Sequence, residues 1–89
     1  MTLAPTLTTL DALKAGQSAT VIHLAPSANA IGGEGLDVSR RLMELGFVPG
    51  ERIRMLKRGF TGGPLAVKVG QSTFALRRFE AALVSIQPE

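Results

Sequence analysis

Short alternating segments separated by glycine turns constrain this chain most strongly. In "ERIRMLKR" (51–58), Ile53 and Met55 alternate with charged side chains, and the segments "LAVKV" (65–69) and "STFALR" (72–77) follow. Alternation with a period of two residues is typical of strands that bury one face. The Gly-Gln pair between the last two segments favours a tight hairpin whose loop starts with glycine. The region therefore predicts three successive strands, of which the last two form a hairpin.

A short helix is predicted before these strands, within the segment "LDVSRRLMELG" (36–46). Its apolar residues recur at i, i+4 and i+7 and share one face: Val38, Leu42 and Leu45. Asp37 is a candidate N-cap and Ser39 competes with it, because both side chains can accept a backbone N–H. Gly46 suits the left-handed residue that ends a helix, and the Pro-Gly pair within Val48–Glu51 favours a type II turn.

The remaining segments predict further short elements. A β-branched run predicts a strand over residues 17–25, and the Pro-, Asn- and Gly-rich stretch Pro26–Gly35 predicts a loop. Three leucines near the N-terminus are spaced three apart and fit either a short helical turn or an apolar clasp: Leu7, Leu10 and Leu13. "RFEAA" predicts one helical turn, and "LVSIQ" predicts a last strand.

Together these elements predict a mainly β fold. Five short strands in 89 residues are too few for a large open sheet with both faces covered, but they can close into a small barrel around an internal core. The helix and the Pro-Gly turn then form the crossover that brings the second strand beside the first. We expect a flexible tail at 1–6 and one domain over 7–89.

Composition limits the classes of protein that fit. The chain is 45% hydrophobic, contains no cysteine and has no apolar run of the roughly 18 residues that a membrane span needs. Disulfides and thiolate metal sites are therefore excluded, and we expect a cytoplasmic location. The net charge of +3 is unevenly distributed, because residues 36–89 carry 9 basic and 5 acidic side chains. A positive face is expected on that part of the chain.

The central segment resembles a known family. The run Arg41-Leu42-x-x-Leu45-Gly46-Phe47-x-Pro49-Gly50 and the "PLAV…ALRR" hairpin resemble the FeoA family of ferrous iron transport accessory proteins. The resemblance extends from Leu7 to Ile86, although Pro26–Gly35 is long and Gly63 stands where an acidic residue often precedes the proline. It implies an SH3-like barrel, similar to the domains that end iron-dependent repressors. It also implies a FeoB-type membrane Fe²⁺ transporter as partner, through which alone this protein would contact the membrane.

The helix and the residue after its terminal glycine supply the candidate partner-binding residues: Arg40, Arg41, Met43, Glu44 and Phe47. The two arginines could bind an acidic partner surface, or they could belong to a solvated helix face on which Arg40 pairs with Glu44. Met43 points away from the apolar stripe and suits an adaptable interface, or it packs under the neighbouring loop.

His23 is the candidate metal ligand, for Fe²⁺ or Zn²⁺. A closed site normally needs three or four ligands, so one histidine would need a second chain in a homodimer to complete it. No cofactor is expected to be required. The glycine-rich stretches lack the spacing of phosphate-binding loops, and no nucleophile motif is present, so we expect no enzymatic activity.

A small nucleic-acid-binding barrel is the alternative function. Six cations could follow a phosphate backbone: Arg52, Arg54, Lys57, Arg58, Arg77 and Arg78. Single-strand binders also stack bases on exposed aromatic rings, however, and this chain has four Phe and no Tyr or Trp. We therefore expect no specific nucleic-acid partner.

Overall fold

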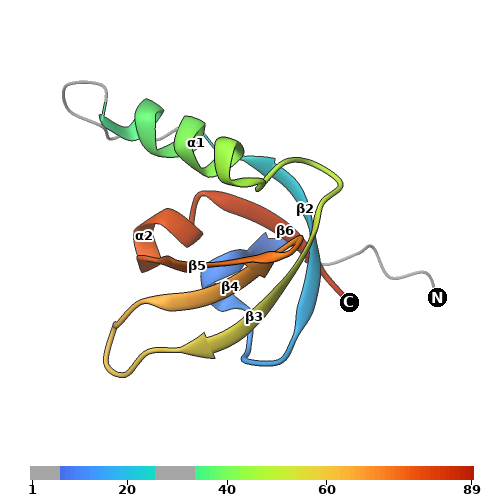
Figure 1. The fold of residues 1–89 in the computed structure, drawn as a ribbon, viewed down its shortest axis with the longest axis vertical. Helices are drawn as coiled ribbons and strands as arrows, with labels where there is room; N and C mark the ends of the chain where they lie inside the picture. Colours follow the sequence, from blue (N-terminus) through green and yellow to red (C-terminus); the bar gives the residue numbers. More distant parts are fainter. Residues whose placement is uncertain (1–6, 26–33) are drawn as a thin grey trace.

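Six strands build the core of the protein. The computed structural model describes residues 7–25 and 34–89, in which an antiparallel sheet has the order β1-β6-β2-β3-β4-β5 (Figure 1). The strands are β1 (Thr8–Thr9), β2 (Ser18–Leu24), β3 (Arg52–Arg58), β4 (Leu65–Val69), β5 (Ser72–Leu76) and β6 (Val84–Pro88). The helices are η1 (Leu10–Ala12), α1 (Glu34–Leu45) and α2 (Arg78–Ala81). The predicted tail at 1–6 and most of the predicted loop, 26–33, lie outside the described residues.

The sheet curls around one hydrophobic core, to which every strand from β2 to β6 contributes side chains. Alternation along β3 is as predicted, because Ile53 and Met55 are buried while Arg52 and Arg54 are exposed. The β4–β5 hairpin closes with Val69 paired to Ser72. Its loop starts at Gly70, whose φ is +59°, as a turn beginning with glycine requires. The mainly β prediction is therefore confirmed.

One strand, β1, has no counterpart among the strands predicted from the sequence. Thr8 and Thr9 form β1, which pairs with β6 at the edge of the sheet. Two polar residues give no periodicity signal, so only pairing with β6 identifies them as a strand. The leucines that follow form the predicted helical turn, a 3-10 helix in which Leu10 is buried, and Leu13 is buried directly after it. Leu7 is exposed.

Helix α1 begins earlier than predicted. Its first residue is Glu34, so the prediction that Asp37 or Ser39 is the N-cap was wrong, and residues 34–35 belong to the helix rather than to the predicted loop. Ser39 is instead buried, and its Oγ donates a hydrogen bond to the Ala25 carbonyl at 2.9 Å. This bond attaches the helix to the end of β2.

The end of α1 is specified by local backbone chemistry. The Gly46 N–H donates to the Met43 carbonyl and the Phe47 N–H donates to the Leu42 carbonyl, both at 3.0 Å. This pair of bonds is the Schellman motif, which needs a positive φ at the glycine, and Gly46 has φ +116°. Leu42 and Phe47 are both buried, so the hydrophobic contact that accompanies this motif forms part of the core.

The turn after α1 leads the chain back to the sheet. The Glu51 N–H donates to the Val48 carbonyl at 3.0 Å, and Gly50 has φ +91°, as the predicted type II turn requires. The Gly50 N–H also donates to the Val21 carbonyl, and the Val21 N–H donates to the Glu51 carbonyl, each at 2.8 Å. These two bonds place the start of β3 beside β2.

Candidate protein-docking site

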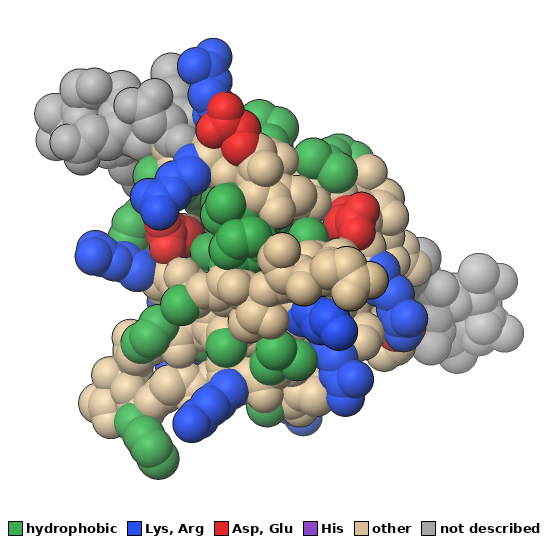
Figure 2. Space-filling view, in the orientation of Figure 1, with side chains coloured by type: hydrophobic (Ala, Val, Ile, Leu, Met, Phe, Trp, Pro, Cys, Tyr) green, Lys and Arg blue, Asp and Glu red, His purple; other side chains and the backbone are tan. Residues whose placement is uncertain are grey.

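The outward side of α1 is a mixed surface of charged and apolar side chains. Arg40, Arg41 and Glu44 are exposed, and Met43 is 45% exposed. Figure 2 shows basic, acidic and hydrophobic side chains at the upper end of the view, where Figure 1 places α1. Across the described residues, no ion pair joins Arg40 to Glu44. Of the two interpretations of Met43, the structure favours the exposed one.

A hollow of about 300 Å³ lies beside this helix, between α1, β5 and α2. Its described lining is Arg41, Leu42, Leu45, Phe74, Ala75, Leu76 and Glu80. Most of these side chains are apolar, while Arg41 and Glu80 contribute opposite charges from two different helices. Helical periodicity points to Arg41 but nothing in the sequence points to Glu80, because the two residues lie far apart in the chain and no local pattern relates them.

Phe47 lies in the core rather than on this surface. It has no exposed area, because it follows the glycine of the Schellman motif and turns inward with Leu42. Its ring is tilted by 54° against that of Phe74, with ring centroids 6.4 Å apart. Since Phe74 lines the hollow, Phe47 supports that surface from beneath. The docking surface, as proposed below, therefore omits Phe47.

Strand β5 borders the same hollow and lies at the end of the sheet. Among the described strands it pairs only with β4, and Ser72, Thr73 and Ala75 are exposed along it. An edge strand presents backbone donors and acceptors to a further strand. The site thus combines a helix surface, an apolar hollow and a strand edge.

His23 lies on a different element, β2, where a register shift separates it from Val21. The residue is exposed and pairs across the sheet with Ser85. Among the side chains that the structure describes, those of residues 7–25 and 38–89, no three His, Asp or Glu groups come close enough together to hold a metal ion. The assignment of His23 as a metal ligand, alone or across a homodimer, stays a prediction.

Three of the cations proposed for nucleic-acid binding are used within the fold. Arg58 Nη1 donates to the Asp11 and Leu13 carbonyls at 2.8 and 2.6 Å, and Arg78 Nη2 donates to the Gly59 carbonyl at 3.4 Å. Arg52 forms a bidentate ion pair with Glu89, with N···O distances of 2.7 and 2.9 Å. The other three remain exposed: Arg54, Lys57 and Arg77. The nucleic-acid alternative therefore has half of its proposed contacts available.

The Arg52–Glu89 pair also affects protonation. The hydrogen bond from Arg52 to Glu89, followed by the charge of that carboxylate, raises the pKa of Arg52. Since an arginine pKa is already far above neutrality, this guanidinium stays charged at any physiological pH.

No helix in the part of the chain that the structure describes is long and apolar enough to cross a membrane.

Comparison with known families gives a match over nearly the whole chain. The family model for the FeoA domain matches residues 8–88. A comparison with curated protein sequences finds no match.

Several solved structures are similar to this one. FeoA of Stenotrophomonas maltophilia in complex with zinc, described as an SH3 domain protein and a candidate ferrous iron transport activating factor, is 38% identical with a TM-score of 0.76. That alignment covers 92% of this chain and 95% of the other. FeoA of Chlorobium tepidum is 32% identical with a TM-score of 0.73, covering 90% of this chain and 69% of that one. The expected SH3-like fold is confirmed.

A manganese-dependent transcriptional repressor is similar in fold alone. It is 20% identical with a TM-score of 0.79, and the alignment covers 98% of this chain but 44% of the repressor. The likeness shows that part of this repressor has the same fold as the present chain.

Proposed function

This chain belongs to the FeoA family. From that premise we propose that it is a cytoplasmic protein that regulates ferrous iron transport by binding a FeoB-type membrane transporter. The family match over residues 8–88 supports treating 7–89 as one functional domain. The relative from Stenotrophomonas maltophilia, described as a candidate activating factor of this transport, supports an accessory role. The proposed role is binding without catalysis.

The observation that carries this proposal is the hollow beside α1. A partner side chain that enters it would bury apolar area against Leu42, Leu45 and Phe74. Arg41 and Glu80 line the same hollow with opposite charges, so a partner segment with complementary charges would be held in one orientation. Met43 and Arg40 extend the surface along the helix. These features suit a protein partner better than a small molecule.

Binding at this surface regulates the transporter only if the protein prefers one of the transporter's states. A ligand shifts a conformational equilibrium by no more than its difference in affinity for the two states. The proposed accessory role therefore requires that affinity differ between nucleotide-bound and nucleotide-free transporter.

A titration with the intact transporter and with its soluble GTPase domain tests the proposal. Arg41→Glu and Met43→Asp alter exposed side chains, and each is expected to weaken binding about tenfold, which corresponds to about 1.4 kcal/mol. Glu80→Gln keeps an oxygen that can accept the bond from the Arg77 N–H, now 2.7 Å, but removes the charge. Lys14→Glu is the control, because Lys14 is exposed and lies outside the described lining of this hollow.

The result that would exclude the site is specific. If Arg41→Glu and Glu80→Gln at the hollow and Met43→Asp beside it all bind the transporter as tightly as the unchanged protein, this surface is not the interface. If the unchanged protein binds neither the intact transporter nor its GTPase domain, the proposed function itself is wrong.

A further inference from the structure

The loop between β3 and β4 exposes an aromatic ring. Phe60 is 93% exposed, more than any other large hydrophobic side chain in the described residues. Two backbone hydrogen bonds nevertheless hold the loop in one conformation. The Gly59 N–H donates to the Pro64 carbonyl at 2.9 Å, and the Gly63 N–H donates to the Phe60 carbonyl at 2.8 Å. A side chain at position 59 would come within 2.8 Å of the Pro64 carbonyl oxygen, so the two sides of the loop approach closely. The fold therefore holds Phe60 outward.

An apolar hollow of about 310 Å³ lies at the base of this loop. Its described lining is Lys57, Gly59, Phe60, Pro64, Ala66 and Ala75. Lys57 is the only charged residue among them. Exposed apolar surface of this kind, bordered by polar residues, marks contact sites for proteins or membranes.

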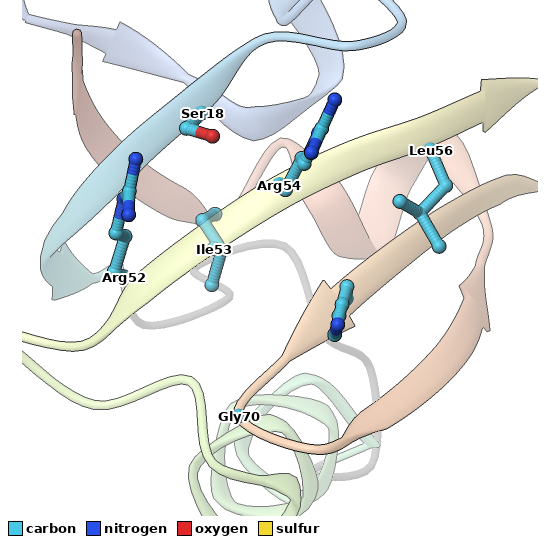
Figure 3. Close-up of a pocket in the computed structure, with 7 residues that line it drawn as sticks. Ser18, Arg52, Ile53, Arg54, Leu56 and Gly70 are labelled. Carbon is cyan, nitrogen blue, oxygen red and sulfur yellow. The ribbon is translucent and has the colours of Figure 1, made fainter.

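Cations continue along the same outer surface of the sheet. Arg54 on β3 pairs in register with Lys68 on β4, and Lys57 pairs with Ala66. Leu56, which is 41% exposed, lies between the two cations of β3. Figure 3 shows Arg52, Arg54 and Leu56 along β3, with Ser18 on the neighbouring strand. A hollow of about 310 Å³ lies among these side chains.

Negative charge on this surface is confined to one end. Glu89 is engaged in the ion pair with Arg52, whereas no ion pair involves Arg54, Lys57 or Lys68 in the described structure. Figure 2 shows several basic side chains in the lower half of the view and a hydrophobic group projecting at the lower left, where Figure 1 places the β3–β4 loop. The surface is therefore amphipathic, with a row of cations leading to an apolar tip.

We propose that this surface binds directly to an anionic lipid bilayer. Phe60 enters the boundary between headgroups and acyl chains, while Arg54, Lys57 and Lys68 lie against the lipid phosphates. Buried apolar area and attraction to anionic headgroups are the two contributions that hold peripheral proteins on membranes. Each cation near such a surface strengthens binding by about fivefold.

This binding goes beyond the proposed function, and it differs from the expectation that membrane contact occurs only through the transporter. In Figure 1, α1 and the β3–β4 loop lie at opposite ends of the molecule. The protein can therefore contact the transporter through α1 and the bilayer through Phe60 at the same time. Attachment to the membrane would raise its local concentration near a membrane-embedded partner.

The arrangement favours a lipid surface over a nucleic acid. A protein that binds single strands places aromatic rings among its cations, so that bases stack while phosphates are neutralised. None of the described residues that line the cationic hollow is aromatic: Ser18, Arg52, Ile53, Arg54, Leu56, Lys68 and Gly70. The most exposed ring, Phe60, is instead at the loop tip, where Lys57 is the one cation that lines the same described hollow, and the other exposed ring, Phe79, lies on α2.

Sedimentation with protein-free vesicles tests this inference independently of the transporter. The full chain is mixed with phosphatidylcholine vesicles that contain or lack about one third phosphatidylglycerol, at low and high salt. We expect binding to the anionic vesicles that weakens with salt. The paired substitution Arg54→Gln and Lys68→Gln should reduce binding about 25-fold, and Phe60→Ser about tenfold.

Variants of the α1 surface provide matched controls. Arg40→Gln removes an exposed cation and Met43→Ser an exposed apolar side chain, and both should leave vesicle binding unchanged. Phe60→Trp introduces a single tryptophan into a chain that has none, so its emission should shift to the blue on anionic vesicles. Far-ultraviolet circular dichroism verifies that each variant is folded.

Three results would overturn the inference. The first is the absence of binding to anionic vesicles at low salt. The second is binding that Phe60→Ser leaves unchanged, which would mean charge attraction without insertion. The third is a short single-stranded DNA that binds the same cations more tightly than the vesicles do. None of these results bears on binding to the transporter.

Discussion

Substitution of Gly46 by alanine adds a single methyl group and should strongly change the free energy of unfolding. Gly46 has φ +116°, a conformation that residues with a side chain adopt only at a cost. A Cβ there would also lie 3.0 Å from Val69 Cγ1, closer than ordinary van der Waals contact. We expect Gly46→Ala to lower the free energy of unfolding by about 2–3 kcal/mol, from about 1–2 for the backbone and about 1 for the contact.

Gly16→Ala separates these two contributions. Gly16 also has a positive φ, +87°, but a Cβ there would meet no atom within 4 Å. This control should therefore cost only the backbone contribution, about 1–2 kcal/mol. The difference between the two variants measures the contact with Val69.

A double-mutant cycle with Val69→Ala tests that contact directly. The single change should cost about 2 kcal/mol, because a buried valine loses two methyl groups. In the double variant the Cγ1 atom that opposes the new methyl group is absent. The combined loss should therefore be about 1 kcal/mol smaller than the sum of the two single losses.

Urea unfolding followed by far-ultraviolet circular dichroism provides these free energies. For a domain of this size, Gly46→Ala should lower Tm by about 10–20 °C. The reasoning would be refuted if Gly46→Ala were no less stable than Gly16→Ala, or if the losses in the cycle were additive.

Three further predictions follow from individual contacts. Arg58→Met leaves the Asp11 and Leu13 carbonyls without their donor and should cost about 2 kcal/mol in urea unfolding, whereas Arg54→Met on the same strand should change little. Glu89→Gln should leave Tm unchanged, because its ion pair with Arg52 is exposed. The hydrogen bond from Arg52 to Glu89 raises the pKa of Arg52, so any contribution of this pair is complete below the ordinary arginine pKa and is lost only as the pH rises through the raised one. The difference in Tm between the unchanged protein and Glu89→Gln should therefore not change from about pH 7 to pH 10 on account of Arg52. A difference that changes over this range would contradict this account. If His23 is a metal ligand, calorimetry should show Zn²⁺ or Fe²⁺ binding that His23→Ala removes, and flat titrations would exclude it.

Local patterns predicted the parts of the fold that depend on neighbouring residues. The inward positions of Ile53 and Met55 follow from alternation, and Gly46 and Gly50 have the positive φ values that their turns need. The start of α1 was predicted too late in the chain, because Asp37 or Ser39 was taken as its N-cap. The capping preference of a single side chain does not fix where a helix begins.

The candidate site was only partly predictable. Arg41 and Met43 could be identified as outward-facing from helical periodicity. Phe47 was included among the partner-binding residues but is buried, since its direction is set by the Schellman motif and by packing on Phe74. The opposing charge of Glu80 could not be anticipated, because it reaches the hollow only when α2 packs near α1.

By itself, the sequence determined which residues form most of the strands, where the helix ends and which family the chain resembles. These properties depend on backbone preferences and on the period of apolar residues, both of which act over a few neighbouring positions. Tertiary structure alone decided that Arg58 binds carbonyls beside η1, that Arg41 and Glu80 share a hollow, and that Phe60 projects beyond a row of cations. Each of these depends on closure of the sheet, which brings distant segments together and assigns every side chain to the core or to solvent.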